Sequence, residues 1–154
     1  MQKQNILIRQ CARADIDAIV DMERQWEQED IAFGDFNPIS REAWIADLER
    51  FPAYFLVAEY AGQLVGYVNA TVQDNQPMPA TGEQLPYVAI ENIYIQPEWR
   101  NNQVGGRLIA TLFEVAKRQG IERFTVSSSS KDMDRVLRFY RNHGFTLWQI
   151  HLFK

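Results

Sequence analysis

The chain has 154 residues, which is the size of one domain and long enough to bury about two thirds of the surface that the unfolded form exposes. With 46% hydrophobic and 23% charged residues the composition is that of a globular protein, and no apolar run approaches the roughly 20 residues that span a bilayer, so no membrane partner is expected. The net charge of -4 and the scattered Lys and Arg residues disfavour nucleic acid as a partner.

The N-terminus and the cysteine content bear on the compartment. Residues 1–9 enter an alternating, strand-like stretch without the basic region, apolar core and cleavage site of an export signal. The only cysteine, Cys11, cannot form an internal disulfide, which fits a reducing compartment and also a disulfide-free secreted protein. We expect a cytoplasmic protein in which Cys11 is a small apolar residue at the end of a strand.

Hydrophobic periodicity and breakers divide the chain into strands and helices. Residues 25–37 mix aromatics with carboxylates and contain breakers, so they are predicted as a loop or an irregular helix end, and residues 74–86 hold three prolines and are predicted as a long loop. In chain order the elements are a strand at 5–10, a helix from Asp15, a helix capped by Ser40, a hairpin of strands at 54–60 and 64–72 around Gly62, a strand at 87–95, a helix from Val104 to Gly120, a strand at 121–127, a helix that ends at Gly144, and a strand at 145–153.

This order, βααβββαβαβ, indicates one α/β (α+β) domain over residues 1–154, with a mixed, mostly antiparallel central sheet flanked by helices. No internal repeat or linker divides the chain.

Residues 96–107 join the predicted strand at 87–95 to the predicted helix from Val104 through a turn. Unpaired N–H groups and the helix dipole make such a helix N-terminus a candidate anion site. Gly105 and Gly106 lie in the first helical turn, where each costs up to about 1 kcal/mol relative to alanine, so close approach of a pyrophosphate or tight helix packing must require them. The segment is neither a Walker A loop nor a dinucleotide-binding fingerprint.

Residues 90–105 resemble the acetyl-CoA signature of the GNAT superfamily of N-acetyltransferases, whose core is [Q/R]-x-x-G-x-[G/A]. Arg100 and Gly105 match this core, and Gln103 stands where the family prefers glycine. Residues 135–145 are similar to a second family element, A-x-x-F-Y-x-x-x-G-F. The resemblance implies a GNAT-like fold and transfer of an acyl group from CoA to an amine.

The resemblance implies acetyl-CoA as co-substrate, with the pantetheine arm held by backbone groups near Ile93 and Ile95. No metal is expected, because His143 and His151 are badly spaced for ligands and His143 is better explained as a helix cap. The implied cofactor-binding residues are Ile93, Tyr94, Ile95, Arg100, Asn101, Asn102, Gln103, Val104, Gly105 and Gly106.

Direct transfer from a thioester to an amine needs a base, oxyanion donors and an acid for the departing thiolate. The resemblance implies Tyr140 as the acid, although a core tyrosine on an amphipathic helix is the alternative. Glu91 is expected to be buried in its strand and is a candidate base, with a structural ion-pair partner as the equal alternative. The backbone N–H near Ile93 is the implied oxyanion donor.

Residues 25–37 contain carboxylates beside aromatic rings, a combination that suits a cationic amine, and the resemblance implies that they form the acceptor-binding loop. The alternative interpretation of the same residues is an exposed, charged helix end. We therefore expect an N-acetyltransferase acting on a small cationic primary amine. The alternatives are a protein or peptide N-acetyltransferase, a non-catalytic acyl-CoA-binding domain, and a generic α/β binding domain with a chance motif. Trp148 and Phe153 are candidates for a homodimer contact. The candidate acceptor-binding residues are Trp26, Glu27, Asp30 and Phe33.

Overall fold

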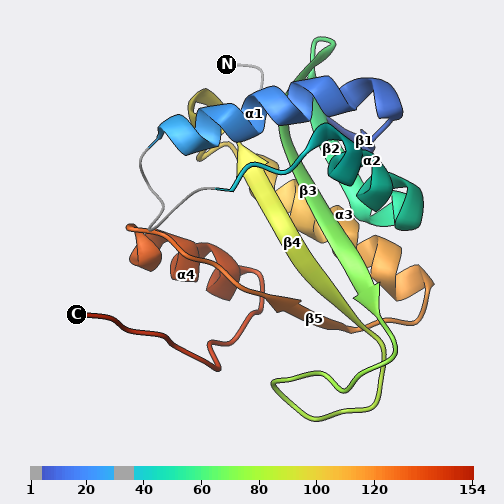
Figure 1. Cartoon of the computed structure of the whole chain (residues 1–154), viewed down its shortest axis with the longest axis vertical. Helices are drawn as coiled ribbons and strands as arrows, with labels where there is room; N and C mark the ends of the chain where they lie inside the picture. The colour runs from blue at the N-terminus through green and yellow to red at the C-terminus, as the bar shows by residue number, and fades with distance from the viewer. Residues whose placement is uncertain (1–4, 30–36) are drawn as a thin grey trace.

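The computed structural model describes residues 5–29 and 37–154 and has the predicted α/β class (Figure 1). Within these residues no helix has the length and apolar character needed to cross a membrane. The strands are β1 (Leu7–Gln10), β2 (Phe55–Tyr60), β3 (Gln63–Gln73), β4 (Tyr87–Ile95) and β5 (Arg123–Val126). The helices are α1 (Ile16–Gln28), α2 (Arg41–Arg50), α3 (Val104–Arg118) and α4 (Met133–Asn142), with short 3-10 helices η2 (Arg13–Asp15), η3 (Pro52–Tyr54) and η4 (Pro97–Trp99).

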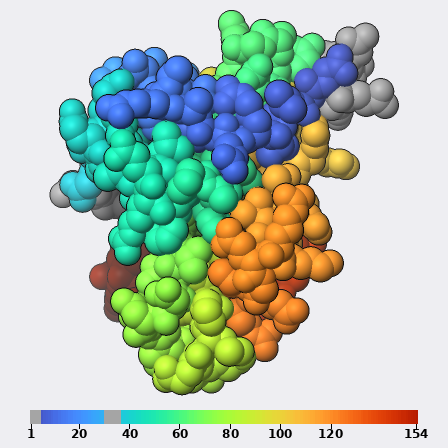
Figure 2. Space-filling view, turned by 90° about the vertical axis from the view of Figure 1, so that its right-hand side faces the viewer, coloured from blue at the N-terminus to red at the C-terminus, as the bar shows by residue number. Residues whose placement is uncertain are grey.

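The five strands form one sheet in the order β1-β2-β3-β4-β5. All neighbouring pairs are antiparallel except β4 and β5, which are parallel. α1 and α2 cover one face and α3 the other, and Figure 2 shows α2 and α3 on opposite sides with residues 74–86 at one end. Each face therefore has its own apolar cluster: Leu108, Ile109 and Leu112 of α3 lie in one, and Ile19 and Trp44 of α1 and α2 in the other.

The residues predicted to begin or end helices and to form the hairpin turn do so in the structure. The Ser40 hydroxyl accepts a hydrogen bond from the backbone N–H of Ala43 (3.1 Å), which caps α2. Gly120, which ends α3, has a φ of 75°, and the turn between β2 and β3 places Ala61 and Gly62 at φ values of 49° and 80°. Such left-handed positions favour glycine because it lacks a Cβ.

One prediction about elements is resolved and one is wrong. Residues 25–28 form the end of α1, which continues to Gln28, so the helix-end alternative holds for them. The predicted closing strand is absent, because residues 145–154 form no ladder with any strand. A segment with alternating apolar residues forms a strand only if the edge of a neighbouring strand pairs with its backbone. In Figure 1 the segment of residues 145–154 runs away from the sheet beside α4. Its large apolar side chains are exposed: Leu147, Trp148, Ile150, Leu152 and Phe153.

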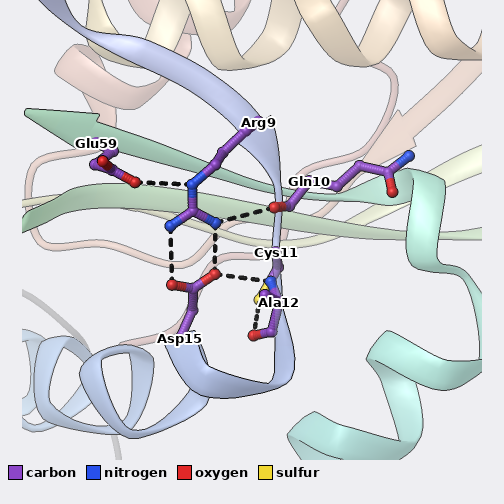
Figure 3. A network of polar contacts seen from close by, with 6 residues as sticks. All are labelled: Arg9, Gln10, Cys11, Ala12, Asp15 and Glu59. Carbon is purple, nitrogen blue, oxygen red and sulfur yellow. Dashed lines mark hydrogen bonds and ion pairs between the residues drawn. The ribbon is translucent and has the colours of Figure 1, made fainter. Parts of the chain in front are cut away.

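An arginine near the N-terminus joins three elements (Figure 3). The Arg9 guanidinium on β1 donates to both carboxylate oxygens of Asp15 (2.6 and 3.0 Å) and to Glu59 on β2 (2.8 Å). Asp15 also accepts from the N–H of Ala12 (2.7 Å), which fixes the entry into α1. Cys11 beside this network is buried, as expected for a small apolar residue, and burial raises the pKa of its thiol to about 12.

Candidate active site

β4 has strand neighbours on both sides only along its first half. The parallel register with β5 runs from Tyr87 to Ile90, whereas β4 continues to Ile95 and stays paired with β3. Within the described residues, the β5-facing edge of positions 91–95 therefore has no strand partner. Its N–H and C=O groups, apart from the Ile95 carbonyl that accepts from Arg100, are available to an extended ligand, such as a pantetheine arm.

A β-bulge marks the point where the two strands separate. Asn69 of β3 pairs with Asn92 and Ala70 pairs with Ile90, so Glu91 has no partner in the register. Glu91 is exposed, and its carboxylate accepts a hydrogen bond from the Thr71 hydroxyl (3.0 Å). The expectation that Glu91 is buried is wrong, because the extra residue turns its side chain out of the packed sheet.

After β4 the chain passes through η4 to the N-terminus of α3. Gln103 is the N-cap of α3 and has a φ of 64°, a left-handed conformation, and Asn101 has a φ of 61°. The first intrahelical bond runs from the N–H of Arg107 to the carbonyl of Gln103 (2.9 Å). The N–H groups of the preceding turn, at 104–106, have no intrahelical acceptor and form a site suited to a phosphate.

The two glycines of this turn allow α4 to pack closely against α3. A Cβ on Gly105 would lie 3.2 Å from the Phe139 ring, and one on Gly106 would lie 2.9 Å from Nε2 of His143. Tight helix packing therefore accounts for both glycines. It also brings α4, which carries Tyr140, against the N-terminus of α3.

The Arg100 side chain is bound inside the protein, on the side of α1. Its Nε donates to the carbonyl of Ile95 (2.9 Å), and its Nη2 pairs with the carboxylate of Glu29 (2.8 Å). Tyr94 donates its hydroxyl proton to Glu29, and Trp26 stacks on the Tyr94 ring at 5.5 Å. Burial, with help from Glu29, raises the pKa of Tyr94. The side chains of Arg100 and Tyr94 thus link β4 and the loop after it to the end of α1.

Tyr140 is buried on α4 and lies against the rings of Phe139 and Phe145. Burial raises the pKa of its hydroxyl, and a hydrogen bond with Ser128 opposes that rise. The phenol is therefore protonated at neutral pH, the state required of an acid. His143 hydrogen-bonds the carbonyl of Phe139 through Nδ1 (2.7 Å), which confirms it as a cap at the end of α4.

The remaining predicted site residues are dispersed. Asp30 and Phe33 lie outside the described residues. Glu27 is exposed and lines a surface pocket of about 570 Å³ on the flank of α1, away from Tyr94 and Trp26. Among the residues that the structure describes, no group of His, Cys, Asp or Glu side chains could hold a metal ion. Asn102 is half-buried, and Ile93 and Ile95 direct their side chains to the cluster under α3.

Sequence reasoning missed a row of polar side chains on the α2-facing side of the sheet. Asn69, only 1% exposed, forms hydrogen bonds with Asp47 of α2 and with Asn92 of β4. Thr71 forms a hydrogen bond with Glu91. An asparagine inside the apolar run of β3 was the available signal, because a buried polar group requires partners. Glu29 was also missed, since its role depends on Arg100, which lies 71 positions away.

Comparisons with known proteins bear on the fold and on the family. In sequence, the chain is 22% identical to "Probable hydrolase YhcX" of Bacillus subtilis (strain 168) over 97% of this chain, and it spans 35% of the length of that relative. In structure, it is similar to an aminoglycoside acetyltransferase, meta-AAC0020, from an uncultured soil metagenomic sample (TM-score 0.75, 20% identity, 100% of this chain and 98% of that chain).

Two further solved structures share the fold. Ard1 from Thermoplasma volcanium has a TM-score of 0.71 at 18% identity over 92% of this chain and 82% of that chain. A predicted acetyltransferase from Clostridium acetobutylicum, solved with acetyl-CoA, has a TM-score of 0.70 at 19% identity over 97% of this chain and 95% of that chain. At these identities the likeness shows the fold, and it confirms the predicted fold class.

The family model for the acetyltransferase (GNAT) family matches residues 17–145, which include the free edge of β4, the N-terminus of α3 and Tyr140. This match confirms the resemblance drawn from the two sequence elements. The chain therefore belongs to the acetyltransferase (GNAT) family.

Proposed function

We propose that the protein moves an acetyl group from acetyl-CoA to a primary amine of a small cationic molecule, by direct transfer in a ternary complex. The observation that carries this proposal is the separation of β4 from β5 after Ile90, which leaves a strand edge leading to the free N–H groups at the start of α3. Such an edge suits the amide-containing pantetheine arm, and the helix N-terminus suits the pyrophosphate.

In this proposal the neutral amine nitrogen attacks the thioester carbonyl, the C–S bond breaks, and the thiolate takes a proton from Tyr140. The nitrogen gives up its remaining extra proton to solvent, from which Tyr140 is protonated again. Tyr140 suits that role because it is buried and protonated, on a helix packed against the N-terminus of α3 through Gly105. The N–H of Ile93, on the unpaired part of β4, is the proposed donor to the developing oxyanion.

The ammonium form of the acceptor must lose a proton before it attacks, and Glu91 is the proposed base, directly or through a water. Its exposure supports the role, because the carboxylate can reach both a substrate and solvent. Its position in the bulge, at the point where β4 separates from β5, also supports the role.

The cationic acceptor is supported by the acidic surroundings and by relatives of the same fold. Asp47 and Glu91 lie on the α2 side of the sheet and form no ion pair within the described part of the chain, so they favour a positively charged ligand. An aminoglycoside acetyltransferase with a TM-score of 0.74 to this chain was solved in complex with sisomicin. The proposed location is the cytoplasm, and the proposed assembly is a homodimer.

The first test is the thermal shift of the purified protein with acetyl-CoA and with free CoA, because a ligand that binds only the folded state raises its apparent stability. We expect a saturable rise with both. Release of thiol from acetyl-CoA is then followed with sisomicin, spermidine and a peptide with a free N-terminus, and the fastest acceptor defines the substrate class.

Tyr140→Phe supplies the matched catalytic variant. Removal of one general acid typically costs about 100-fold to 10,000-fold in rate, so kcat should fall by about that factor while the CoA-induced thermal shift remains. A preferred peptide would favour a protein acetyltransferase. Binding of acetyl-CoA without thiol release for any amine would favour a non-catalytic domain, and no shift at millimolar CoA would reject the proposal.

A further inference from the structure

Two short hydrogen-bond chains run side by side on the face of the sheet that α2 covers. In the first, Asn92 of β4 donates through Nδ2 to Oδ1 of Asn69 (3.0 Å), and Asn69 donates through Nδ2 to the carboxylate of Asp47 (3.4 Å). In the second, Gln73 donates through Nε2 to the Thr71 hydroxyl (3.0 Å), which in turn donates to Glu91 (3.0 Å).

The carboxylate at one end fixes the direction of the first chain. Burial raises the pKa of Asp47 and the nearby charge of Arg50 lowers it; as a carboxylate it can only accept. Asn69 must therefore present its NH₂ group to Asp47 and its oxygen to Asn92. Asn92 must then present its own NH₂ group to Asn69. The amide oxygen of Asn92 is left as the free end of the chain.

The second chain ends in oxygen as well. The carboxylate of Glu91 accepts the Thr71 hydroxyl through Oε1, and its other oxygen has no hydrogen-bond donor among the described residues. Asn69 and Thr71 lie two positions apart on β3 and so point to the same face. Because each holds one of the two adjacent residues of the bulge, the free oxygens of Glu91 and Asn92 open on that same face.

The site has acceptors and negative charge without a matching cation. Neither Glu91 nor Asp47 forms an ion pair within the described part of the chain. Asn69 is buried, whereas Asn92 is half-buried and Glu91 is exposed, so the chains lead from the interior to an accessible end. A primary ammonium carries three N–H donors and one positive charge, and it complements two neighbouring oxygens of which one belongs to a carboxylate.

We infer that the amide oxygen of Asn92 and the carboxylate of Glu91 form the subsite that binds the acceptor's primary ammonium, and that Asn69 and Asp47 are positioning residues that keep the Asn92 oxygen turned toward it. The inference rests on the proposed function, since it names the group that receives the acetyl. It places the reacting nitrogen at positions 91 and 92, next to the proposed oxyanion donor at Ile93, rather than among the residues at the end of α1.

Asn92→Ala tests the subsite directly. A hydrogen bond to a charged group accounts for about tenfold to hundredfold in binding, so KM for the best of sisomicin, spermidine and the peptide should rise by that factor. KM for acetyl-CoA and the CoA-induced thermal shift should stay as in the wild type. Asn75→Ala, the same change at an exposed asparagine in the loop of residues 74–86, is the control and should leave both KM values unchanged.

An exchange of the two ends tests the direction of the chain. Asn92→Asp alone places a carboxylate at each end of Asn69, and whichever way the amide turns, one oxygen faces another. Melting temperature should fall because the buried Asn69 loses its hydrogen bond to residue 92, whereas KM for the amine should not rise, since the new carboxylate still offers the ammonium an oxygen. Asp47→Asn combined with Asn92→Asp reverses the chain and restores both hydrogen bonds of Asn69, so the melting temperature should return close to wild type while KM for the amine stays at or below the wild-type value.

The outcomes separate this inference from the proposed function. Absence of a CoA thermal shift would reject the function itself. A normal CoA shift and normal turnover with an unchanged amine KM in Asn92→Ala would overturn the subsite alone. Failure of the double exchange to recover the melting temperature, or a rise of its amine KM above the wild-type value, would overturn the positioning role. If no primary amine saturates the wild-type protein, an ammonium subsite is absent and the inference is rejected.

Discussion

Gln103 shows how one residue departs from the family preference while keeping the local backbone. The family prefers glycine at this position of the signature, and the structure gives the physical reason, because the N-cap of α3 has a φ of 64°. A non-glycine residue in the left-handed region costs about 1–2 kcal/mol of folding free energy. Glycine avoids this cost, but it loses more conformational entropy on folding, which offsets part of the gain. The side chain of Gln103 is exposed, so its removal costs little packing.

Gln103→Gly should therefore raise the free energy of unfolding by about 0.5 kcal/mol. Urea denaturation measures the change. Gln84→Gly, at an exposed position without a positive φ, is the matched control and should lower the free energy of unfolding by about 0.5 kcal/mol. Equal destabilisation by both variants would contradict the strain at Gln103.

Asp15 should make stability depend on pH. Its hydrogen bonds to Arg9 and to the N–H of Ala12 hold the pKa of this carboxyl below its usual range, against the opposing effect of burial. The unfolded chain therefore takes up the proton at a higher pH than the folded one, so the stabilisation is complete above the usual pKa and is lost as pH falls through the folded value.

Asp15→Asn should lower the free energy of unfolding by about 1–2 kcal/mol at pH 7, since the carboxylate accepts charge-assisted bonds that an amide cannot replace. Urea denaturation at pH 7 and at about pH 3 should show the difference from wild type shrinking at the lower pH, below the usual Asp pKa of about 3.9. Asp74→Asn, in an exposed loop, is the control without a network. A difference that is the same at both pH values would refute the linkage.

At the scale of elements, helices and sheet pairs with strong local signals were predictable and positions that depend on a distant partner were not. Ser40 and Gly120 act within their own turns, so the sequence around them defines the ends of α2 and α3. Glu91 was expected to be buried because the other residues of its strand are suited to burial, but the register with β3 skips that residue. The pattern of residues 145–153 predicts a strand, yet no pattern states which edge it pairs with.

The contact between α3 and α4 permits a test of why Gly106 is glycine. Alanine would favour the helix by up to about 1 kcal/mol, but its Cβ would lie 2.9 Å from a His143 ring that is held by its bond to Phe139. Gly106→Ala should lower the free energy of unfolding by about 1–2 kcal/mol in the wild type, as overpacking does. In the His143→Ala background the same change should raise it. Equal effects in the two backgrounds, measured by urea denaturation, would show that the residues do not interact.

At the scale of the whole molecule, the C-terminal segment, which forms no strand in this chain, supports the proposed homodimer. Trp148, Ile150 and Leu152 alternate along residues 145–154 and are 53%, 67% and 84% exposed, and β5 ends the sheet order with no strand on its outer side in the described chain. An extended apolar segment and a free strand edge complement each other, and two copies can satisfy both by symmetric exchange. Such a large exposed apolar surface is otherwise unfavourable in water.

Size-exclusion chromatography with light scattering should therefore give about twice the 18.0 kDa chain mass for the wild type. The triple variant Trp148→Ser, Ile150→Ser, Leu152→Ser should be monomeric, and its circular dichroism should match the wild type because these side chains contact little of their own domain. Leu85→Ser removes a similarly exposed apolar side chain, 57% exposed, from another part of the surface and should leave the dimer intact. A monomeric wild type at about 100 μM would rule out the exchange, because apolar interfaces large enough to bury such segments give dissociation constants well below that concentration.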